Sequence, residues 1–128
     1  MKWIEYLGWS NQQVNDLRYV GYLYLYEGKY DIATSFFEAL TVLDPDNISD
    51  VHALGALYLE TGKGLEALSY LNTALQTEPN HQVSLLNKSK ALFNLGYKKQ
   101  ALALAKTLLL SDNEKVKDQA QALVLAYS

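Results

Sequence analysis

The sequence predicts an all-α protein, a solenoid of three helix-turn-helix repeats that is closed by a C-terminal capping helix. Two observations carry this prediction. Shifting the 128-residue chain against itself by 34 residues aligns three glycines, and the same shift aligns three alanines. A fixed period of this length is typical of proteins in which each repeat is one pair of helices. The aligned residues are Gly28, Gly62 and Gly96, and Ala33, Ala67 and Ala101.

The three repeats are expected to span residues 14–47, 48–81 and 82–115 of a single domain. Small residues let the two helices of a repeat approach closely, and a large residue fills the space between them. Glycine ends the first helix because it adopts the left-handed backbone conformation that other residues resist. Proline ends the second helix because it has no backbone N–H. The small residues are Gly21, Gly55 and Ser89, the large ones are Tyr24, Tyr58 and Leu92, and the chain stops at Pro45, Pro79 and Asn113.

Residues 19–30 carry five tyrosines, and their alternation between Tyr22 and Tyr26 is also compatible with a strand. A short apolar run cannot be assigned from its period alone, so the repeat decides in favour of a helix. On a helix Tyr19, Tyr22 and Tyr26 share one face, whereas Tyr24 points into the core. The first repeat is therefore expected to carry an aromatic face.

The period and its aligned positions resemble the tetratricopeptide repeat, in which the first helices line the concave side of a superhelix. The resemblance implies a peptide-binding groove. Tyrosine suits its wall because the side chain offers a large contact area and a hydroxyl group. Carried over to this sequence, the lining comprises Arg18, Tyr19, Tyr22, Leu25 and Tyr26 in the first repeat, His52, Ala53, Ala56, Leu59 and Glu60 in the second, and Leu86, Asn87, Lys90, Phe93 and Asn94 in the third.

Other interpretations of this face stay open. Tyr19 or Tyr26 could pack on an N-terminal helix instead of contacting a ligand. A clamp for acidic C-termini is not expected, because tetratricopeptide domains of that type carry basic or amide residues where this chain has Tyr22, Ala53 and Val83.

The first repeat is also similar to the tetratricopeptide chaperones of bacterial type III secretion that guard translocator subunits. The shared pattern has a G-K-Y turn between the two helices of the repeat and the sequence A-L-x-x-L-D-P at the end of the second helix. This chain matches it at Leu17, Gly21, Gly28, Lys29, Tyr30, Ala33, Phe37, Ala39, Leu40, Leu43 and Asp44.

This resemblance implies a non-enzymatic chaperone of the bacterial cytoplasm that holds an extended segment of a secreted translocator or needle subunit. A homodimer, or a heterodimer with a co-chaperone, is a further expectation. Its mode stays open because only thirteen residues precede the first repeat, whereas members of the group usually have a longer N-terminal region. The alternative is a scaffold that assembles several proteins through its convex face or through the end that carries Trp3 and Trp9.

Composition excludes several other classes. The net charge is −3 and the lysines are scattered, which argues against nucleic-acid binding. No segment predicts a membrane span or a signal peptide. The chain has no cysteine and no catalytic or nucleotide-binding motif, so we expect neither an enzyme nor a cofactor. His52 and His81 are not at metal-ligand spacing, and no metal site is expected.

Both ends of the chain show helix signals. Val116, Ala120, Leu123, Val124 and Tyr127 share one face of a capping helix expected at about residues 114–127, with Ser111 or Asp112 as its N-cap. At the other end a short helix is expected to finish near Gly8. Ser10 and Gln13 then form a capping box for the helix that follows.

Overall fold

The computed structural model describes residues 3–128, and all the regular secondary structure of these residues is helical. The prediction of an all-α fold is confirmed. The elements are α1 (Trp3–Tyr6), α2 (Asn11–Tyr26), α3 (Tyr30–Leu43), α4 (Ile48–Glu60), α5 (Gly64–Thr77), α6 (Gln82–Asn94), α7 (Lys98–Thr107), the 3-10 turn η1 (Leu108–Leu110) and α8 (Glu114–Tyr127).

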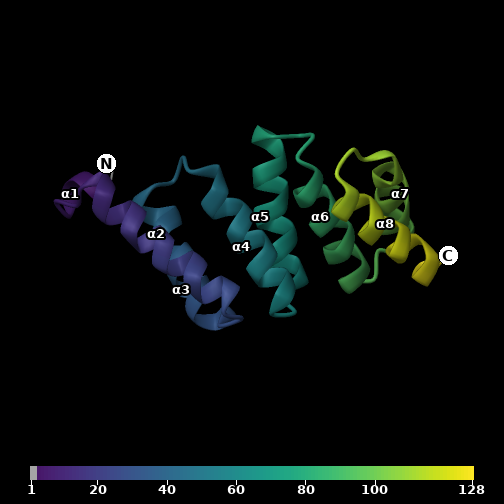
Figure 1. Cartoon of the computed structure of the whole chain (residues 1–128), viewed down its shortest axis with the longest axis horizontal. Coiled ribbons are helices and arrows are strands. Elements are labelled where there is room, and N and C mark those ends of the chain that lie inside the picture. Colours follow the sequence, from purple (N-terminus) through teal and green to yellow (C-terminus); the bar gives the residue numbers. More distant parts are fainter. Residues whose placement is uncertain (1–2) are drawn as a thin grey trace.

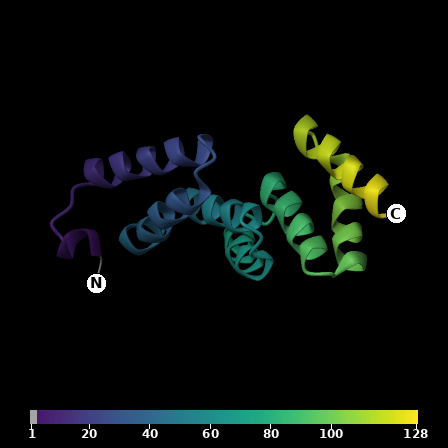
Figure 2. The ribbon, with the colours of Figure 1, turned by 90° about the horizontal axis from the view of Figure 1, so that it is seen from below.

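Consecutive helices pair as α2 with α3, α4 with α5 and α6 with α7, and the pairs follow one another along the long axis of the molecule (Figure 1). Helices α1 and α8 lie at opposite ends of this axis in both views (Figures 1 and 2). Helix α2 begins at Asn11, ahead of residue 14, and α8 begins just before residue 115. The exact boundaries of the three repeats stay predictions.

The first helix of each pair ends in the same way, at a glycine with positive φ. The φ angles are 78° at Gly28, 79° at Gly62 and 90° at Gly96. In the first repeat the N–H of Lys29 donates to the carbonyl of Tyr24 at 2.9 Å, which closes the helix with the 6→1 bond of a Schellman motif. This reversal lets the second helix run back along the first.

The small aligned residues bring the helices of each pair together. The three aligned alanines are fully buried. A Cβ atom added at Gly55 would lie 2.8 Å from Cδ2 of Leu71, so a larger side chain would push α4 and α5 apart. In the third pair Ser89 takes the place of glycine, and its hydroxyl donates a 2.8 Å hydrogen bond to the carbonyl of Ala101. This bond joins α6 to α7.

The buried hydrophobic residues group into clusters between neighbouring helices. The first lies between the first two pairs and includes Phe37, Leu40, Leu54 and Leu57, all of them at most 1% exposed. The second lies under α8 and consists of Leu86, Leu108, Val116 and Ala120. The predicted capping helix is thereby confirmed as an element that buries the open face of the last pair.

The N-cap of α8 differs from the prediction. Asn113 caps the helix, and its Oδ1 accepts from the N–H of Val116 at 3.2 Å. Ser111 instead accepts from the N–H of Asn113 at 3.1 Å. A capping side chain must stand directly before the first helical residue, so Ser111 and Asp112 are too far from the helix start.

The N-terminal signals are confirmed at residue level. Helix α1 ends before Gly8, which has a φ of 69°. Ser10 accepts from the N–H of Gln13 at 3.1 Å, and the Gln13 side chain accepts from the N–H of Ser10 at 2.8 Å. The tryptophans stay exposed, at 47% for Trp3 and 37% for Trp9. Ile4 is the α1 residue that packs against the first cluster.

Candidate functional site

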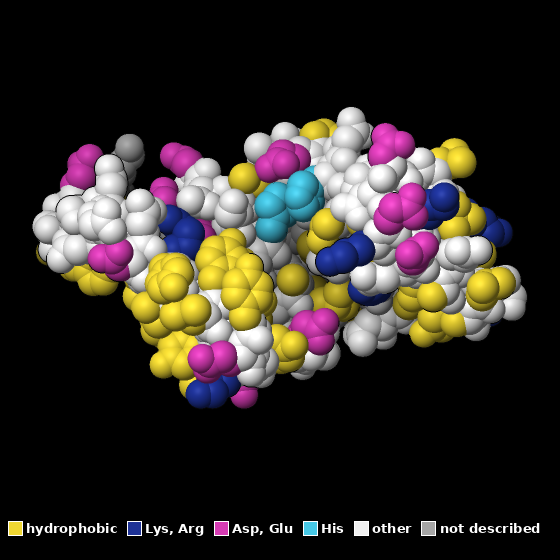
Figure 3. All heavy atoms as spheres, viewed as in Figure 1, with side chains coloured by type: hydrophobic (Ala, Val, Ile, Leu, Met, Phe, Trp, Pro, Cys, Tyr) yellow, Lys and Arg dark blue, Asp and Glu magenta, His cyan; other side chains and the backbone are white. Residues whose placement is uncertain are grey.

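The first helices of the three pairs enclose a hollow of about 250 Å³, which we call the groove. Four of the residues expected from the sequence line it: Tyr22, His52, Ala56 and Asn87. Leu25 and Ala53, also expected in the lining, are there as well, whereas four other lining residues were not expected: Ser49, His81, Val83 and Ser84. Figure 3 shows hydrophobic side chains beside the chain's two histidines on one face of the molecule.

Tyr22 is the aromatic side chain of the groove wall, and packing fixes its ring. It meets Phe37 edge to face, with ring centroids 4.9 Å apart and planes at 73°. Its other neighbour is Tyr26, whose ring stacks on it at 6.2 Å. Burial raises the pKa of Tyr22 above the ordinary value, and the charge of Asp50 adds to this effect. The hydroxyl therefore stays protonated and can donate a hydrogen bond.

The other two tyrosines of the predicted face lie outside the hollow. Tyr19 is 66% exposed and Tyr26 is 78% exposed, so neither is buried against an N-terminal helix. They extend an aromatic surface along α2 from the edge of the groove. Leu59 does not line the hollow either, because it packs against the buried Ala67, Leu71 and Ala91.

The guanidinium of Arg18 is hydrogen-bonded to other side chains of the protein. Its Nε and one terminal nitrogen donate to the two carboxylate oxygens of Asp50 at 2.7 and 2.8 Å. The guanidinium also donates to Asp44 at 2.9 Å and to Asn15 at 2.7 Å. The hydrogen bond with Asp50 raises the pKa of Arg18 further. Arg18 thus ties α2 to α4, and it does not line the groove.

The third-repeat residues Lys90 and Phe93 contact the capping helix. The Lys90 ammonium donates to Oε1 of Gln119 at 2.6 Å, and burial lowers the pKa of Lys90. The ring of Phe93 stacks on Tyr127 with centroids 4.1 Å apart. These contacts place α8 across the end of the predicted lining, so the groove is formed by α2, by α4 and by the first part of α6 with its N-cap His81.

The two histidines are not at metal-ligand spacing in the sequence, but their rings are in contact in the structure. The ring of His52 in α4 stacks on that of His81 at the start of α6, with centroids 4.0 Å apart and an interplanar angle of 20°. Burial and the neighbouring His52 lower the pKa of His81. Sequence spacing missed this pair because the contact depends on how the second repeat stacks on the third.

A family model described as tetratricopeptide repeat matches residues 58–126. The chain belongs to this family. The match covers the second half of the chain, in which α5, α6, α7 and α8 lie. No curated protein matches this tetratricopeptide chain in sequence. Among residues 3–128, none of the helices combines the length and the apolar character that crossing a bilayer requires.

Several solved structures share the fold over almost the whole tetratricopeptide chain. The type III secretion translocator chaperone SycD of Yersinia enterocolitica is 20% identical, with a TM-score of 0.78, and the match covers 98% of both chains. A type III secretion complex from Aeromonas hydrophila is 19% identical, with a TM-score of 0.78, over 99% of this chain and 88% of that one. PcrH of Pseudomonas aeruginosa, solved with the chaperone binding region of PopD, is 24% identical, with a TM-score of 0.76, over 94% of both chains.

Tetratricopeptide domains of other systems have the same fold. The first such domain of Spaghetti (RPAP3), solved with an HSP90 peptide, is 21% identical with a TM-score of 0.76, and the match covers 91% of this chain and 94% of that one. At these identities the likeness shows the fold, which is common to chaperones and to other peptide-binding domains.

Proposed function

We propose that this protein is a non-enzymatic chaperone of type III secretion that holds an extended segment of a secreted translocator or needle subunit in its groove. The observation that carries the proposal is the groove itself. Tyr22 forms a rigid aromatic wall, and the small Ala53 and Ala56 leave space for an apolar side chain. Covering such a segment keeps an aggregation-prone client soluble without nucleotide hydrolysis.

The comparisons support this choice of ligand. PcrH, which has the same fold, was solved with the chaperone binding regions of PopB and of PopD. Three positions at which a clamp for acidic C-termini carries basic or amide residues are occupied in this groove by Tyr22, Ala53 and Val83. The proposed place of action is the bacterial cytoplasm, with no nucleic-acid or membrane partner. A dimer with itself or with a co-chaperone is a further proposal.

Calorimetric titration of the full chain with two peptides tests the proposal. One peptide carries a leucine between flanking prolines, and the other ends in acidic residues. We expect saturable binding of the proline peptide alone. Tyr22→Ala should weaken it by roughly tenfold or more, because alanine removes a buried aromatic contact worth about 2 kcal/mol at a binding hot spot.

Two further variants separate binding from folding. Ala56→Leu fills the groove and leaves the Tyr22–Phe37 contact in place, so it should also block the peptide. Tyr97→Ala removes an exposed tyrosine outside the groove and should bind like the wild type. Equal binding by wild type, Tyr22→Ala and Ala56→Leu would rule out the groove as the binding site.

A scaffold function is the second candidate, and it rests on the exposed aromatic residues at the N-terminal end. Trp3, Tyr6 and Trp9 are 47%, 69% and 37% exposed. Under this alternative Trp3→Ala with Trp9→Ala would abolish assembly with partner proteins, and Tyr22→Ala would leave it intact. Under the chaperone proposal Tyr22→Ala would abolish client solubilisation, and the double variant Trp3→Ala with Trp9→Ala would leave it intact.

A further inference from the structure

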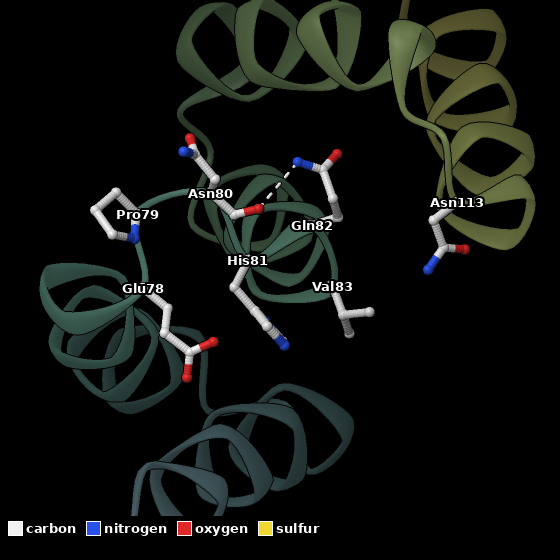
Figure 4. Close-up of a pocket in the computed structure, with 7 residues that line it drawn as sticks. All are labelled: Glu78, Pro79, Asn80, His81, Gln82, Val83 and Asn113. Carbon is white, nitrogen blue, oxygen red and sulfur yellow. Dashed lines mark hydrogen bonds between the residues drawn. The ribbon is translucent and has the colours of Figure 1, made fainter.

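Three groups with metal-ligating atoms meet at the edge of the groove. The imidazoles of His52 and His81 stack there, and Nε2 of His52 lies 3.5 Å from Oε1 of Glu78. One ligand atom of each residue lies within 4.8 Å of the other two. Figure 4 shows Glu78 and His81 pointing to the same side of the loop that joins α5 to α6, and Figure 3 shows the two histidines in contact.

Ser84 contacts the imidazole rings of both His52 and His81 and fixes their orientation. Its side chain is buried, at 2% exposure, and its Oγ lies 2.7 Å from Nδ1 of His52 and 2.8 Å from Nδ1 of His81. A hydroxyl oxygen can accept two hydrogen bonds. When both Nδ1 atoms carry their proton and donate to Ser84, both Nε2 atoms keep a free lone pair. Metal-ligating histidines are commonly held by such a bond from the other ring nitrogen.

The present contacts tie His52 to Ser84 on one side and to Glu78 on the other. The N–H of Ser84 donates to Nδ1 of His81 at 3.2 Å, so in this arrangement that nitrogen is an acceptor. Nε2 of His52 faces Oε1 of Glu78 at 3.5 Å, and the tautomer decides which ring nitrogen of His52 carries the proton. In the tautomer with the proton on Nδ1, the lone pair of Nε2 faces the carboxylate, and a cation can lie between these two acceptors.

The distances and the ligand types fit one class of cation. Two ligand atoms about 2.1 Å from a tetrahedral metal lie about 3.4 Å apart, and the gap between His52 Nε2 and Glu78 Oε1 is 3.5 Å. Two imidazoles and a carboxylate suit Zn²⁺ and its transition-metal neighbours, whereas Mg²⁺ and Ca²⁺ prefer oxygen ligands alone.

We propose that His52, His81 and Glu78 form a binding site for a divalent transition-metal cation of the Zn²⁺ class. To hold the ion, the stacked rings open and His81 exchanges its bond with the Ser84 N–H for one with the Ser84 hydroxyl. The side chains have room to move, since those of His52 and Glu78 are 18% and 42% exposed. Water or a donor atom of a bound ligand completes the coordination from the groove. The site goes beyond the proposed chaperone function and does not rest on it.

Titration of tag-free, chelator-treated full-length protein with Zn²⁺ tests the site. Calorimetry should show one ion per chain with a micromolar or tighter dissociation constant. Co²⁺ should give the visible absorption of a tetrahedral complex, which is lost when Zn²⁺ is added. Glu78→Gln and His52→Asn should each weaken Zn²⁺ binding by roughly 10- to 100-fold or more.

Two more variants make the result specific. His81→Asn retains a good N-cap for α6 while it removes the imidazole, so it should lose metal binding without unfolding the helix. Glu66→Gln removes the same charge from an exposed position of α5 and should bind Zn²⁺ like the wild type. Circular dichroism without metal checks that all variants are folded.

Absence of saturable Zn²⁺ binding to the wild type would overturn the site, as would equal affinity of Glu78→Gln and Glu66→Gln. The peptide titration, repeated with a chelator present, keeps the two proposals apart. Glu78 does not line the groove, so Glu78→Gln should lose the metal and still bind the peptide. Absence of metal binding would therefore not contradict the chaperone proposal. Absence of peptide binding would likewise not contradict the metal site.

Discussion

At the scale of single residues, Arg18 is the clearest case of a side chain whose role depends on its surroundings. As a residue on the face of a first helix, it was expected to contact a ligand. Its partners Asp50 and Asp44 are 32 and 26 residues away in sequence. The stacking of the second repeat on the first brings them within hydrogen-bond distance, and the carboxylate of Asp50 is fully buried by the contact.

Arg18→Met should destabilise the protein strongly, because it leaves the Asp50 charge buried without its partner. Breaking a buried ion pair in this way typically costs about 3–5 kcal/mol of unfolding free energy. Urea denaturation measures the loss. Lys29→Met, which removes an ion pair exposed on both sides, should cost less than about 1 kcal/mol. Equal losses in the two variants would contradict the structural role of Arg18.

The same scale shows what the sequence could and could not predict about the site. Tyr22, His52, Ala56 and Asn87 line the groove, and each stands at a position that the repeat alignment singles out. His81, Ser84 and Glu78 belong to the start of α6 or to the turn before it, outside the positions that a repeat alignment singles out. Their contact with His52 depends on the rotation between adjacent repeats, and no local pattern encodes that rotation.

At the scale of the helices, the ends were predictable because each depends on a few neighbouring residues. The glycine after each first helix follows from the positive φ of the turn, and the capping box follows from the side chains of Ser10 and Gln13, three residues apart. The N-cap of α8 was misassigned because Ser111, Asp112 and Asn113 are all residue types that cap helices well. Only the position of the first helical residue distinguishes them.

Gly62→Ala tests the turn between α4 and α5. The added Cβ would meet no atom within 4 Å, so any cost comes from the backbone, whose φ is 79°. A residue with a Cβ pays about 1–2 kcal/mol in this left-handed region. Thermal and urea unfolding should show that loss for Gly62→Ala and a smaller one for Gly62→Asn, because asparagine tolerates the conformation better. The prediction fails if both variants are as stable as the wild type.

At the scale of the whole molecule, the repeat period was sufficient to predict the fold. Each pair packs mainly on its neighbours, so one period along the chain specifies the whole arrangement. The period did not reveal that α8 contacts Lys90 and Phe93 and so shortens the groove. That contact involves a helix outside the repeats, whose direction the period does not describe.

Leu108→Ala should weaken one end of the solenoid more than the other. Leu108 is 2% exposed in the cluster under α8, and truncating such a leucine costs about 2–5 kcal/mol. Hydrogen exchange should become faster in α7 and α8 while α2, α3 and α4 keep most of their protection. Leu125→Ala, at a residue that is 74% exposed on α8, is the matched control and should change little. Uniform acceleration along the chain would show that the solenoid unfolds as one unit.

The ties from Arg18 to Asp44 and Asp50 also affect how the protein can be engineered. Repeat proteins are often treated as strings of interchangeable modules. Here the first module carries the cation and one of its anions, while the second carries the other anion, buried at the joint. A chimaera that exchanges the first module for one without a matching arginine would leave the Asp50 carboxylate buried without a partner. The junction of such a chimaera should therefore lie after α5, downstream of all three charged residues.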